Sequence, residues 1–218
     1  MAAIRPAAAN LNSEARERIL AAAYDLFSRQ GIRAVGVDWI IAAAGVAKTT
    51  FYRHFPSKDD LVLAFLERRE QLWTLDWLET QVMNRSAAPD QRLLAVFDVF
   101  NEWFHREDFE GCSFINVLLE TPEPGNPIRQ ASTTHLARIR DFLRRLAEDA
   151  EVSQPDDFAR KWHVLMKGSI VAAEEGDQLA ARRAREVGRL LLQAEGGRIR
   201  KHHRPVTLSS RAVPSKKR

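Results

Sequence analysis

Apolar residues recur at steps of three and four through most of this 218-residue chain, and that spacing limits the fold more than any other feature. Leu93, Phe97, Phe100 and Phe104 form one such stripe, and an α-helix places residues at these steps on a single face. Runs of alternating Val, Ile and Thr, which would indicate strands, are missing from the sequence. The chain is therefore predicted to be all-α.

Capping residues and helix breakers divide this pattern into separate helices. Ser13 can cap a helix that Gly31 ends, and Ser57 can cap another whose first turn holds Asp59 and Asp60. Proline and glycine between the stripes mark the remaining breaks. We expect nine helices: residues 13–30, 37–44, 48–55, 58–83, 90–106 and 113–120, one that begins at Asn126, and two over 153–176 and 178–195.

Two of these helices have well-defined apolar sides. The long helix over residues 58–83 is predicted to bury Leu61, Phe65, Leu72 and Leu75, which follow one another at steps of four, seven and three. The apolar side of the last helix is predicted to comprise Leu179, Ala184, Val187, Leu190, Leu191 and Ala194. Each of these sides needs a partner surface.

Composition excludes several classes of protein. Charges interrupt every apolar stretch, so none reaches the ~18 residues that suggest a membrane span. Residues 1–10 lack the apolar core of a signal peptide. Cys112 is the single cysteine, which excludes an intrachain disulfide and a cysteine-rich zinc site. We expect a cytoplasmic protein with no cofactor, no bound metal and no membrane partner.

Charge is distributed unevenly along the chain, whose formal net charge is +4. Residues 1–57 hold seven basic and four acidic groups, residues 58–195 hold 18 and 25, and residues 196–218 hold eight and none. An acidic body favours nucleic-acid contact through the basic N-terminal end. The tail over 196–218 has no amphipathic period and is predicted to be disordered; it either binds phosphates nonspecifically or only aids solubility.

Two short helices separated by Gly45-Val46 fit a helix-turn-helix, in which the second helix can lie in a DNA major groove. Phe51 and Phe55 of that second helix are expected to pack in the core. Its polar residues can reach bases and phosphates: Lys48, Thr49, Thr50, Tyr52, Arg53 and His54. The sequence therefore predicts a DNA-binding domain over residues 13–57.

The segment over residues 40–61, which reads IIAAAGVAKTTFYRHFPSKDDL, resembles the TetR family of bacterial transcriptional regulators. Upstream, the run over residues 19–23, the pair Leu26-Phe27 and Gly31 are similar to the family's first helix. The resemblance covers about residues 15–66. Its most specific features are the turn glycine, the aromatic pair and the Phe-Pro-Ser-Lys exit from the second short helix.

The sequence departs from the family pattern at two positions. Gly36 stands where the family often has Ser or Thr at the start of the first short helix, so no side-chain hydroxyl is available there for a phosphate. Ile41 occupies a position that is usually small, and Trp39 is an unusually bulky neighbour. These departures affect base-level contacts rather than the fold. Farther on, the segment over residues 111–116 is similar to a stretch in one subgroup of these regulators.

The resemblance implies different roles for the polar residues of the second short helix. Phosphate contacts are implied for Lys48, Tyr52 and His54, and positions nearer base edges for Thr49, Thr50 and Arg53. Phosphate contacts set the register on DNA, while base contacts determine specificity. Packing alone for Tyr52 and simple solvation for Lys48 are the alternatives.

The resemblance also implies a domain order and a homodimer. Residues 1–12 are expected to form a flexible arm, 13–57 the helix-turn-helix domain, 58–195 a larger ligand-binding and dimerisation domain, and 196–218 the basic tail. The last two helices are expected to pair with their copies in a four-helix bundle. The predicted interface residues are Phe158, Trp162, Leu165, Ala172, Val187, Leu190 and Leu191. The alternative is that these residues close the core of a single chain.

The middle helices are expected, on the same resemblance, to enclose a mostly apolar or aromatic ligand cavity. The candidate lining residues are Trp73, Trp77, Phe97, Phe100, Trp103, Phe104, Phe114, Asn116, His135, Trp162 and His163. Aromatic stripes at helical spacing also form ordinary core, which is the competing interpretation for most of them. His135 lies between Ala131 and Ile139 on an apolar stripe, so its ring is predicted to point inward.

The resulting hypothesis is a homodimeric repressor that a small apolar or aromatic ligand releases from a palindromic operator. Ligand binding is expected to favour a state in which the helix over 58–83 swings and the two recognition helices separate. An activator or a ligand-independent regulator fits the sequence as well. An enzyme is disfavoured, because the sequence has no Ser/His/Asp arrangement on plausible elements, no phosphate-cradling Gly loop and no HExxH motif.

Overall fold

A computed structural model describes residues 5–195, with side chains from residue 13 onward; the predicted tail over 196–218 lies outside this range. Between residues 5 and 195 the chain forms helices and no strand. The helices are α1 (Arg5–Ala34), α2 (Val37–Ala44), α3 (Lys48–His54), α4 (Lys58–Arg69), η1 (Glu70–Glu79), α5 (Thr80–Arg85), α6 (Pro89–Phe104), α7 (Ser113–Glu120), α8 (Pro127–Asp149), α9 (Pro155–Glu174) and α10 (Ala180–Ala194). The all-α prediction is confirmed, and the expected helices all occur, because α4, η1 and α5 follow one another without a break.

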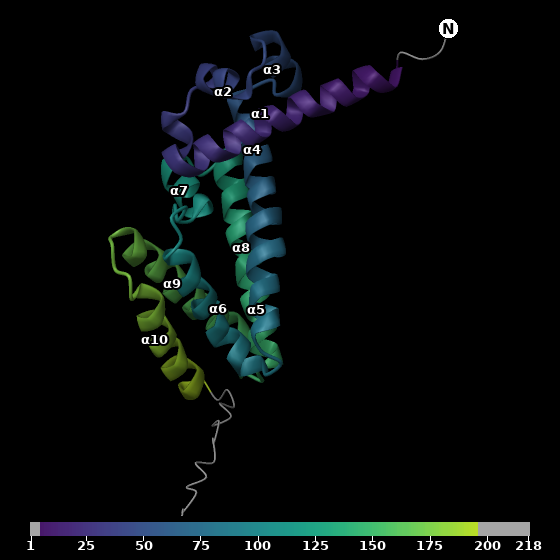
Figure 1. Ribbon diagram of the computed structural model, residues 1–218. Coiled ribbons are helices and arrows are strands. Elements are labelled where there is room, and N and C mark those ends of the chain that lie inside the picture. The colour runs from purple at the N-terminus through teal and green to yellow at the C-terminus, as the bar shows by residue number, and fades with distance from the viewer. Residues whose placement is uncertain (1–4, 196–218) are drawn as a thin grey trace, which may run out of the picture.

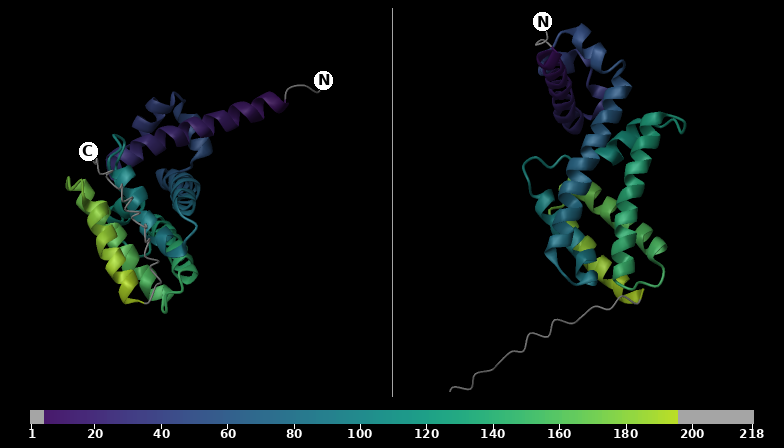
Figure 2. Two further views of the ribbon diagram at one scale, coloured as in Figure 1. Left: turned by 60° about the horizontal axis from the view of Figure 1, so that its bottom comes forward. Right: turned by 90° about the vertical axis from the view of Figure 1, so that its right-hand side faces the viewer.

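The helices form an elongated molecule with two distinct ends (Figure 1). α1, α2 and α3 make up one end, and α4, η1 and α5 run away from it as one rod beside α8. α6, α9 and α10 pack together at the other end, and Figure 2 shows the same separation from two further sides. The N-terminal helices are joined to the rest through α4 and through the packing of α1 on α7.

The predicted caps form at two helix starts. Ser57 Oγ accepts a hydrogen bond from the Asp60 N–H at 3.1 Å, and the Asp60 carboxylate accepts from the Ser57 N–H at 3.0 Å, which completes a capping box. Asn126 Oδ1 accepts from the Ile128 N–H at 2.8 Å. These local hydrogen bonds fix where α4 and α8 begin, as the sequence indicated.

The first helix differs from its prediction at both ends. α1 begins at Arg5 rather than Ser13, so the predicted start of the first helix is wrong. Three consecutive alanines over residues 7–9 favour a helix there, and alanine has the highest helix propensity. Gly31 interrupts the helix with a φ of 77°, and one further helical turn then reaches Ala34.

A π-helical stretch, η1, shifts the buried side of the long rod. Its hydrogen bonds join residues five apart rather than four. The buried side accordingly steps from Trp73 to Leu78, whereas the prediction assumed α-helical spacing throughout. The predicted stripe is therefore wrong beyond Phe65, because Leu72 and Leu75 are 49% and 41% exposed.

A tight aromatic cluster fills the end formed by α6, α9 and α10. The Trp162 ring centroid lies 5.1 Å from that of Phe158 and 5.3 Å from that of Phe97. Gly188 of α10 packs on this cluster, where an added Cβ would lie 2.8 Å from Trp162 Cη2. Phe158 and Trp162 are 0% exposed, so the prediction that they contact a second copy is wrong; the core of one chain already encloses them.

The close approach at Gly188 gives a prediction about stability. We expect Gly188→Ala to be less stable than Gly168→Ala by about 1–3 kcal/mol in urea unfolding followed by circular dichroism. Both substitutions add the same methyl group within a helix, so their gain in helix propensity is shared. An added Cβ at Gly168 meets nothing within 4 Å. Equal stabilities for the two variants would contradict the packing described here.

Candidate nucleic-acid interface

The turn between α2 and α3 depends on a glycine. Gly45 has φ 62° and ψ 41°, in the left-handed region that side chains with a Cβ rarely adopt. Its N–H donates to the carbonyl of Ala42 at 3.2 Å, and the N–H of Val46 donates to the carbonyl of Ile41 at 3.3 Å. This backbone geometry ends α2 and lets α3 start two residues later at Lys48.

Aromatic side chains hold α3 against the other N-terminal helices. Phe51 and Phe55 are buried, with ring centroids 6.3 Å apart. The guanidinium carbon of Arg16, on α1, lies 5.1 Å from the centroid of the Phe55 ring. Since Phe51 of α3 and Phe55, which directly follows α3, face inward, most of the polar residues between and before them lie on the outer face of α3.

The polar residues of α3 are mostly accessible in the free protein. Lys48, Thr49, Tyr52 and Arg53 are exposed, while Thr50 is half-buried. Lys48 Nζ lies 3.3 Å from Asp38 Oδ1 of α2, and Arg53 donates a long hydrogen bond of 3.5 Å to Thr50 Oγ1. Exposed pairs of this kind contribute little energy, so a phosphate can replace Asp38 beside Lys48 at small cost.

His54 is in a different environment from the other candidates. Its side chain is half-buried, and its Nε2 is enclosed without a hydrogen-bond partner within residues 13–195. Burial, with the positive charges of Arg53 and Arg16 nearby, lowers the pKa of the imidazole below its ordinary value. The ring is therefore neutral at neutral pH, so the predicted phosphate contact would be a hydrogen bond rather than an ion pair.

A cleft of about 340 Å³ lies where α1 meets η1 and the segment between α6 and α7. Trp73, Trp77 and Trp103 line one side, and the Trp73 ring centroid lies 5.0 Å from that of Trp103 and 5.6 Å from that of Trp77. The contribution of α1 consists of Tyr24, Asp25, Ser28 and Arg29. We name this cleft the tryptophan cleft. It lies where α1 meets the long rod, and both α1 and the rod contribute residues to it.

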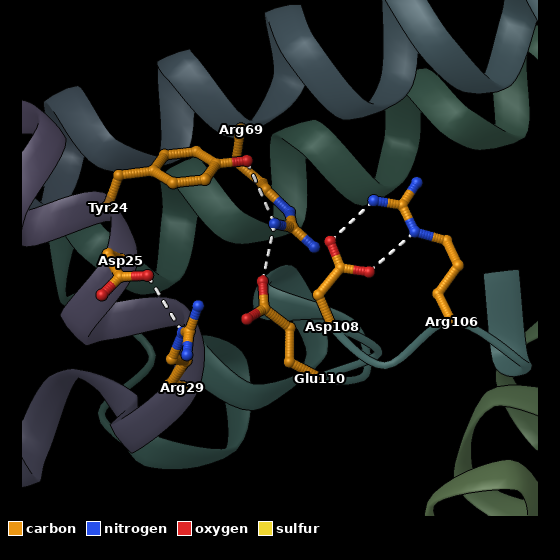
Figure 3. Close-up of polar contacts among 7 residues, drawn as sticks. All are labelled: Tyr24, Asp25, Arg29, Arg69, Arg106, Asp108 and Glu110. Atoms are coloured by element: carbon orange, nitrogen blue, oxygen red, sulfur yellow. Dashed lines mark hydrogen bonds and ion pairs between the residues drawn. The ribbon is translucent and has the colours of Figure 1, made fainter.

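Ion pairs make up the other side of the tryptophan cleft (Figure 3). Arg69 is buried, and its Nη1 donates to Tyr24 Oη and to Glu110 Oε1, each at 3.0 Å. The two remaining pairs are exposed: Asp25 with Arg29 at 2.9 Å, and Asp108 with Arg106 at 2.6 Å. A hydrogen bond from Arg106 holds the pKa of the Asp108 carboxyl below its usual value. The ligand cavity was predicted to be mostly apolar, but charged residues make up half of those that line this cleft.

Of the residues predicted to contact a ligand, Trp73, Trp77 and Trp103 line this cleft, and the others lie elsewhere. Phe97 and Trp162 belong to the cluster under Gly188, and Phe100 and Phe104 pack behind Trp103. Asn116 lines a second cavity, of about 620 Å³, between α1, α7 and α9. The predicted residues do not share one cavity, because the apolar stripes of different helices face different packing interfaces.

The two histidines suggested for the cavity are core residues. The His135 ring stacks on Phe114 with centroids 5.1 Å apart, and its Nδ1 lies 3.0 Å from Glu70 Oε1. The ring points inward, as predicted, but towards a carboxylate of the core rather than a cleft. Burial lowers the pKa of His163 to about 3, so that ring is neutral.

The charged residues of the tryptophan cleft were missed by the sequence interpretation. Arg69 and Glu110 are 41 positions apart, and no local pattern connects them. One signal was available: Arg69 follows Phe65 by four residues, so it occupies a place on a buried helical stripe. A charge on such a stripe indicates a buried partner or a binding site.

A separate apolar surface, named here the α9–α10 face, is exposed on the outermost helices. Val187 and Leu190 of α10 are exposed, and Leu190 reaches 56%. Val164 and Val171 of α9, which were not predicted, are also exposed. The predicted interface residues Leu165, Ala172 and Leu191 are half-buried beside them. An exposed apolar surface over two adjacent helices indicates a partner surface.

Comparison with known proteins agrees with the geometry of α2 and α3. Residues 19–65 match the family model described as "Bacterial regulatory proteins, tetR family". The crystal structure of SCO4454, a TetR-family transcriptional regulator from Streptomyces coelicolor, superposes with a TM-score of 0.76 at 30% identity, covering 84% of this chain and 96% of that one.

Two curated relatives extend the comparison. The HTH-type transcriptional regulator YjdC of Escherichia coli K12 is 24% identical over 155 residues, which are 71% of this chain and 81% of YjdC. The HTH-type transcriptional activator FasR of Mycolicibacterium smegmatis is 31% identical over 137 residues, which are 61% of this chain and 60% of FasR.

The chain belongs to the TetR family and is a DNA-binding transcriptional regulator. Its helix-turn-helix is formed by α2 and α3, within the segment that the family model matches. No helix between residues 5 and 195 is long and apolar enough to cross a membrane.

Lys48 gives a test of how α3 docks. We expect Lys48→Ala to weaken binding to a DNA fragment selected from a random-sequence library, and to lower the slope of log K against log salt by about one for each Lys48 that contacts a phosphate. Fluorescence anisotropy at several salt concentrations measures both. Lys161→Ala is the matched control, since Lys161 carries the same charge but pairs with Asp157 and Glu195 on α9 and beyond α10. A slope equal to that of the control would exclude the phosphate contact.

Proposed function

We propose that the protein is a homodimeric repressor that acts in the bacterial cytoplasm and leaves a palindromic operator when a small molecule binds in the tryptophan cleft. The observation that carries this proposal is the origin of the cleft's residues. Tyr24 and Ser28 belong to α1, which packs against α2 and α3, whereas Trp73 and Trp103 belong to the larger domain. A ligand in the cleft therefore contacts both domains and can favour one arrangement of the pair.

Binding as a dimer is supported by the size of α3 and by the α9–α10 face. A recognition helix over Lys48–His54 offers few contacts to bases and phosphates on its own. Two copies joined by a twofold axis present two such helices to successive turns of DNA, ~34–36 Å apart or a multiple of that distance. Val164, Val171, Val187 and Leu190 supply the apolar surface that such an axis needs.

Selection from a random-sequence DNA library tests the symmetry of the operator. We expect an inverted repeat whose half-site centres are separated by one helical turn or a multiple of one. Enrichment of a single asymmetric site would contradict the proposed dimer. The selected sequence also provides the fragment for the other binding experiments.

The α9–α10 face gives a prediction about assembly. We expect Leu190→Glu to convert the protein to a monomer in size-exclusion chromatography with light scattering, and to weaken operator binding by at least about tenfold, because a charge in an apolar interface loses its hydration. Leu119→Glu is the matched control, since Leu119 of α7 is also an exposed leucine but lies outside the α9–α10 face. A dimer that survives in Leu190→Glu would exclude this face as the interface.

Activation of transcription is the second candidate function, and similarity to the activator FasR favours it. Both functions use the same α2–α3 contact with DNA and differ in where the operator lies relative to the promoter. In vitro transcription from the protein's own operator separates them, since a repressor lowers the amount of transcript and an activator raises it.

A further inference from the structure

The chemistry of the tryptophan cleft narrows the class of effector, provided that the proposed ligand-controlled function is correct. Trp73, Trp77 and Trp103 form an aromatic wall that suits a planar ring. A cavity of about 340 Å³ is near the lower end of small-molecule sites, so a compact ligand with one or two rings fits it.

Several buried hydrogen-bond donors that belong to lining residues of the cleft lack a full set of partners. Ser28 Oγ and Trp73 Nε1 are enclosed, and neither has a hydrogen-bond partner in the part of the chain described, residues 13–195. The Arg69 side chain is 7% exposed, and both of its hydrogen bonds use the same nitrogen, Nη1. Figure 3 shows the other terminal nitrogen of Arg69 directed away from Tyr24 and Glu110. Unpaired buried donors favour a ligand that supplies acceptors.

The acidic groups of the cleft do not favour a cation. Each of the carboxylates of Asp25, Asp108 and Glu110 already pairs with an arginine. A cationic ligand would have to compete with these guanidinium groups, and it would bring no acceptor for Trp73 Nε1. The aromatic wall by itself would attract a cation. The ion pairs and the unpaired donors outweigh this attraction and favour an anionic ligand over a cationic one.

We propose that the effector is a planar aromatic carboxylate whose carboxylate pairs with Arg69 in place of Glu110, while its ring lies against the tryptophan wall. Arg69 presents a planar fork that matches a carboxylate, and its burial strengthens the pairing. A second carboxylate at this buried guanidinium is repelled by that of Glu110, which favours displacement of Glu110 by the ligand. The Glu110 side chain is 20% exposed and can turn into solvent.

Displacement of Glu110 changes the joint between the domains. Glu110 lies in the segment between α6 and α7, and the next residue, Gly111, has a φ of 69° with the Glu174 carboxylate of α9 packed against it. This segment is thus bonded to Arg69 on one side and packed against Glu174 on the other. Loss of the Arg69 contact frees the start of α7, which packs directly on α1.

Isothermal titration calorimetry of the full-length protein with matched probes tests the ligand class. The probes are 2-naphthoate, its neutral amide and 2-naphthylmethylammonium. We expect 2-naphthoate to bind at least about tenfold more tightly than either of the others, because only the carboxylate forms charge-assisted hydrogen bonds with Arg69. Tighter binding of the ammonium probe, equal binding of all three, or binding of none would overturn the proposal.

Two substitutions locate the carboxylate. We expect Glu110→Gln to raise the affinity for 2-naphthoate by about tenfold and to leave that for the amide unchanged, because the competing carboxylate is removed. Asp108→Asn makes the same change of charge in the same cleft, but its partner Arg106 is exposed, so a much smaller effect is expected. Equal effects of the two substitutions would exclude Arg69 as the binding group. Arg69→Gln, checked for folding by circular dichroism, should lose the preference for the carboxylate.

Operator binding is measured separately from ligand binding in these experiments. If 2-naphthoate binds with the expected pattern but leaves the anisotropy of labelled operator unchanged, the ligand class stands and ligand-controlled release fails. If the amide or the ammonium probe releases the operator instead, ligand control stands and the aromatic carboxylate is excluded.

Discussion

The packing of α1 on α4 is the interaction on which the rest of the structure depends. Phe65 of α4 is fully buried, and its ring meets Tyr24 and Phe27 of α1 edge-on, with centroids 5.5 Å away in both cases. Because α2 and α3 pack on α1, this contact fixes the direction in which the recognition helix points. One turn beyond Phe65, Arg69 continues the same interface and bonds Tyr24. Apolar packing and a buried charge therefore lie side by side at the joint.

The π-helical stretch explains why the tryptophan cleft occurs where α1 meets the long rod. An α-helical rod would continue the stripe of Phe65 through Leu72 and Leu75, but the wider η1 turns keep Trp73 on the buried side and leave those leucines exposed. Trp73 then meets Trp103 across the cleft. The irregular helix thus sets an aromatic wall opposite the ion pairs of α1 and the α6–α7 segment. π-Helical turns are frequent at functional sites.

The opposite end of the molecule combines a tight core with an open surface. Gly188 allows α10 to approach Trp162 and Phe97 closely, which places Leu192 and Ala184 inward and leaves Val187 and Leu190 outward. The large aromatic residues stabilise one chain, and smaller aliphatic residues remain on the surface, where we propose that a second copy binds. In the proposed dimer, this division separates folding of the single chain from assembly.

The all-α class, most helix starts, the Gly45 turn and the polar residues on α3 could be predicted from the sequence, because caps, turns and short aromatic spacings act within a few residues. The remaining features depend on contacts between segments that are far apart along the chain. Apolar spacing cannot tell which stripe faces a core and which faces a partner, so Phe158 and Trp162 were assigned to the wrong surface. The tryptophan cleft unites Tyr24, Arg69 and Glu110, which lie far apart along the chain, and η1 changes the helical period itself. Such features follow from the shapes of packed neighbours, which no local pattern specifies.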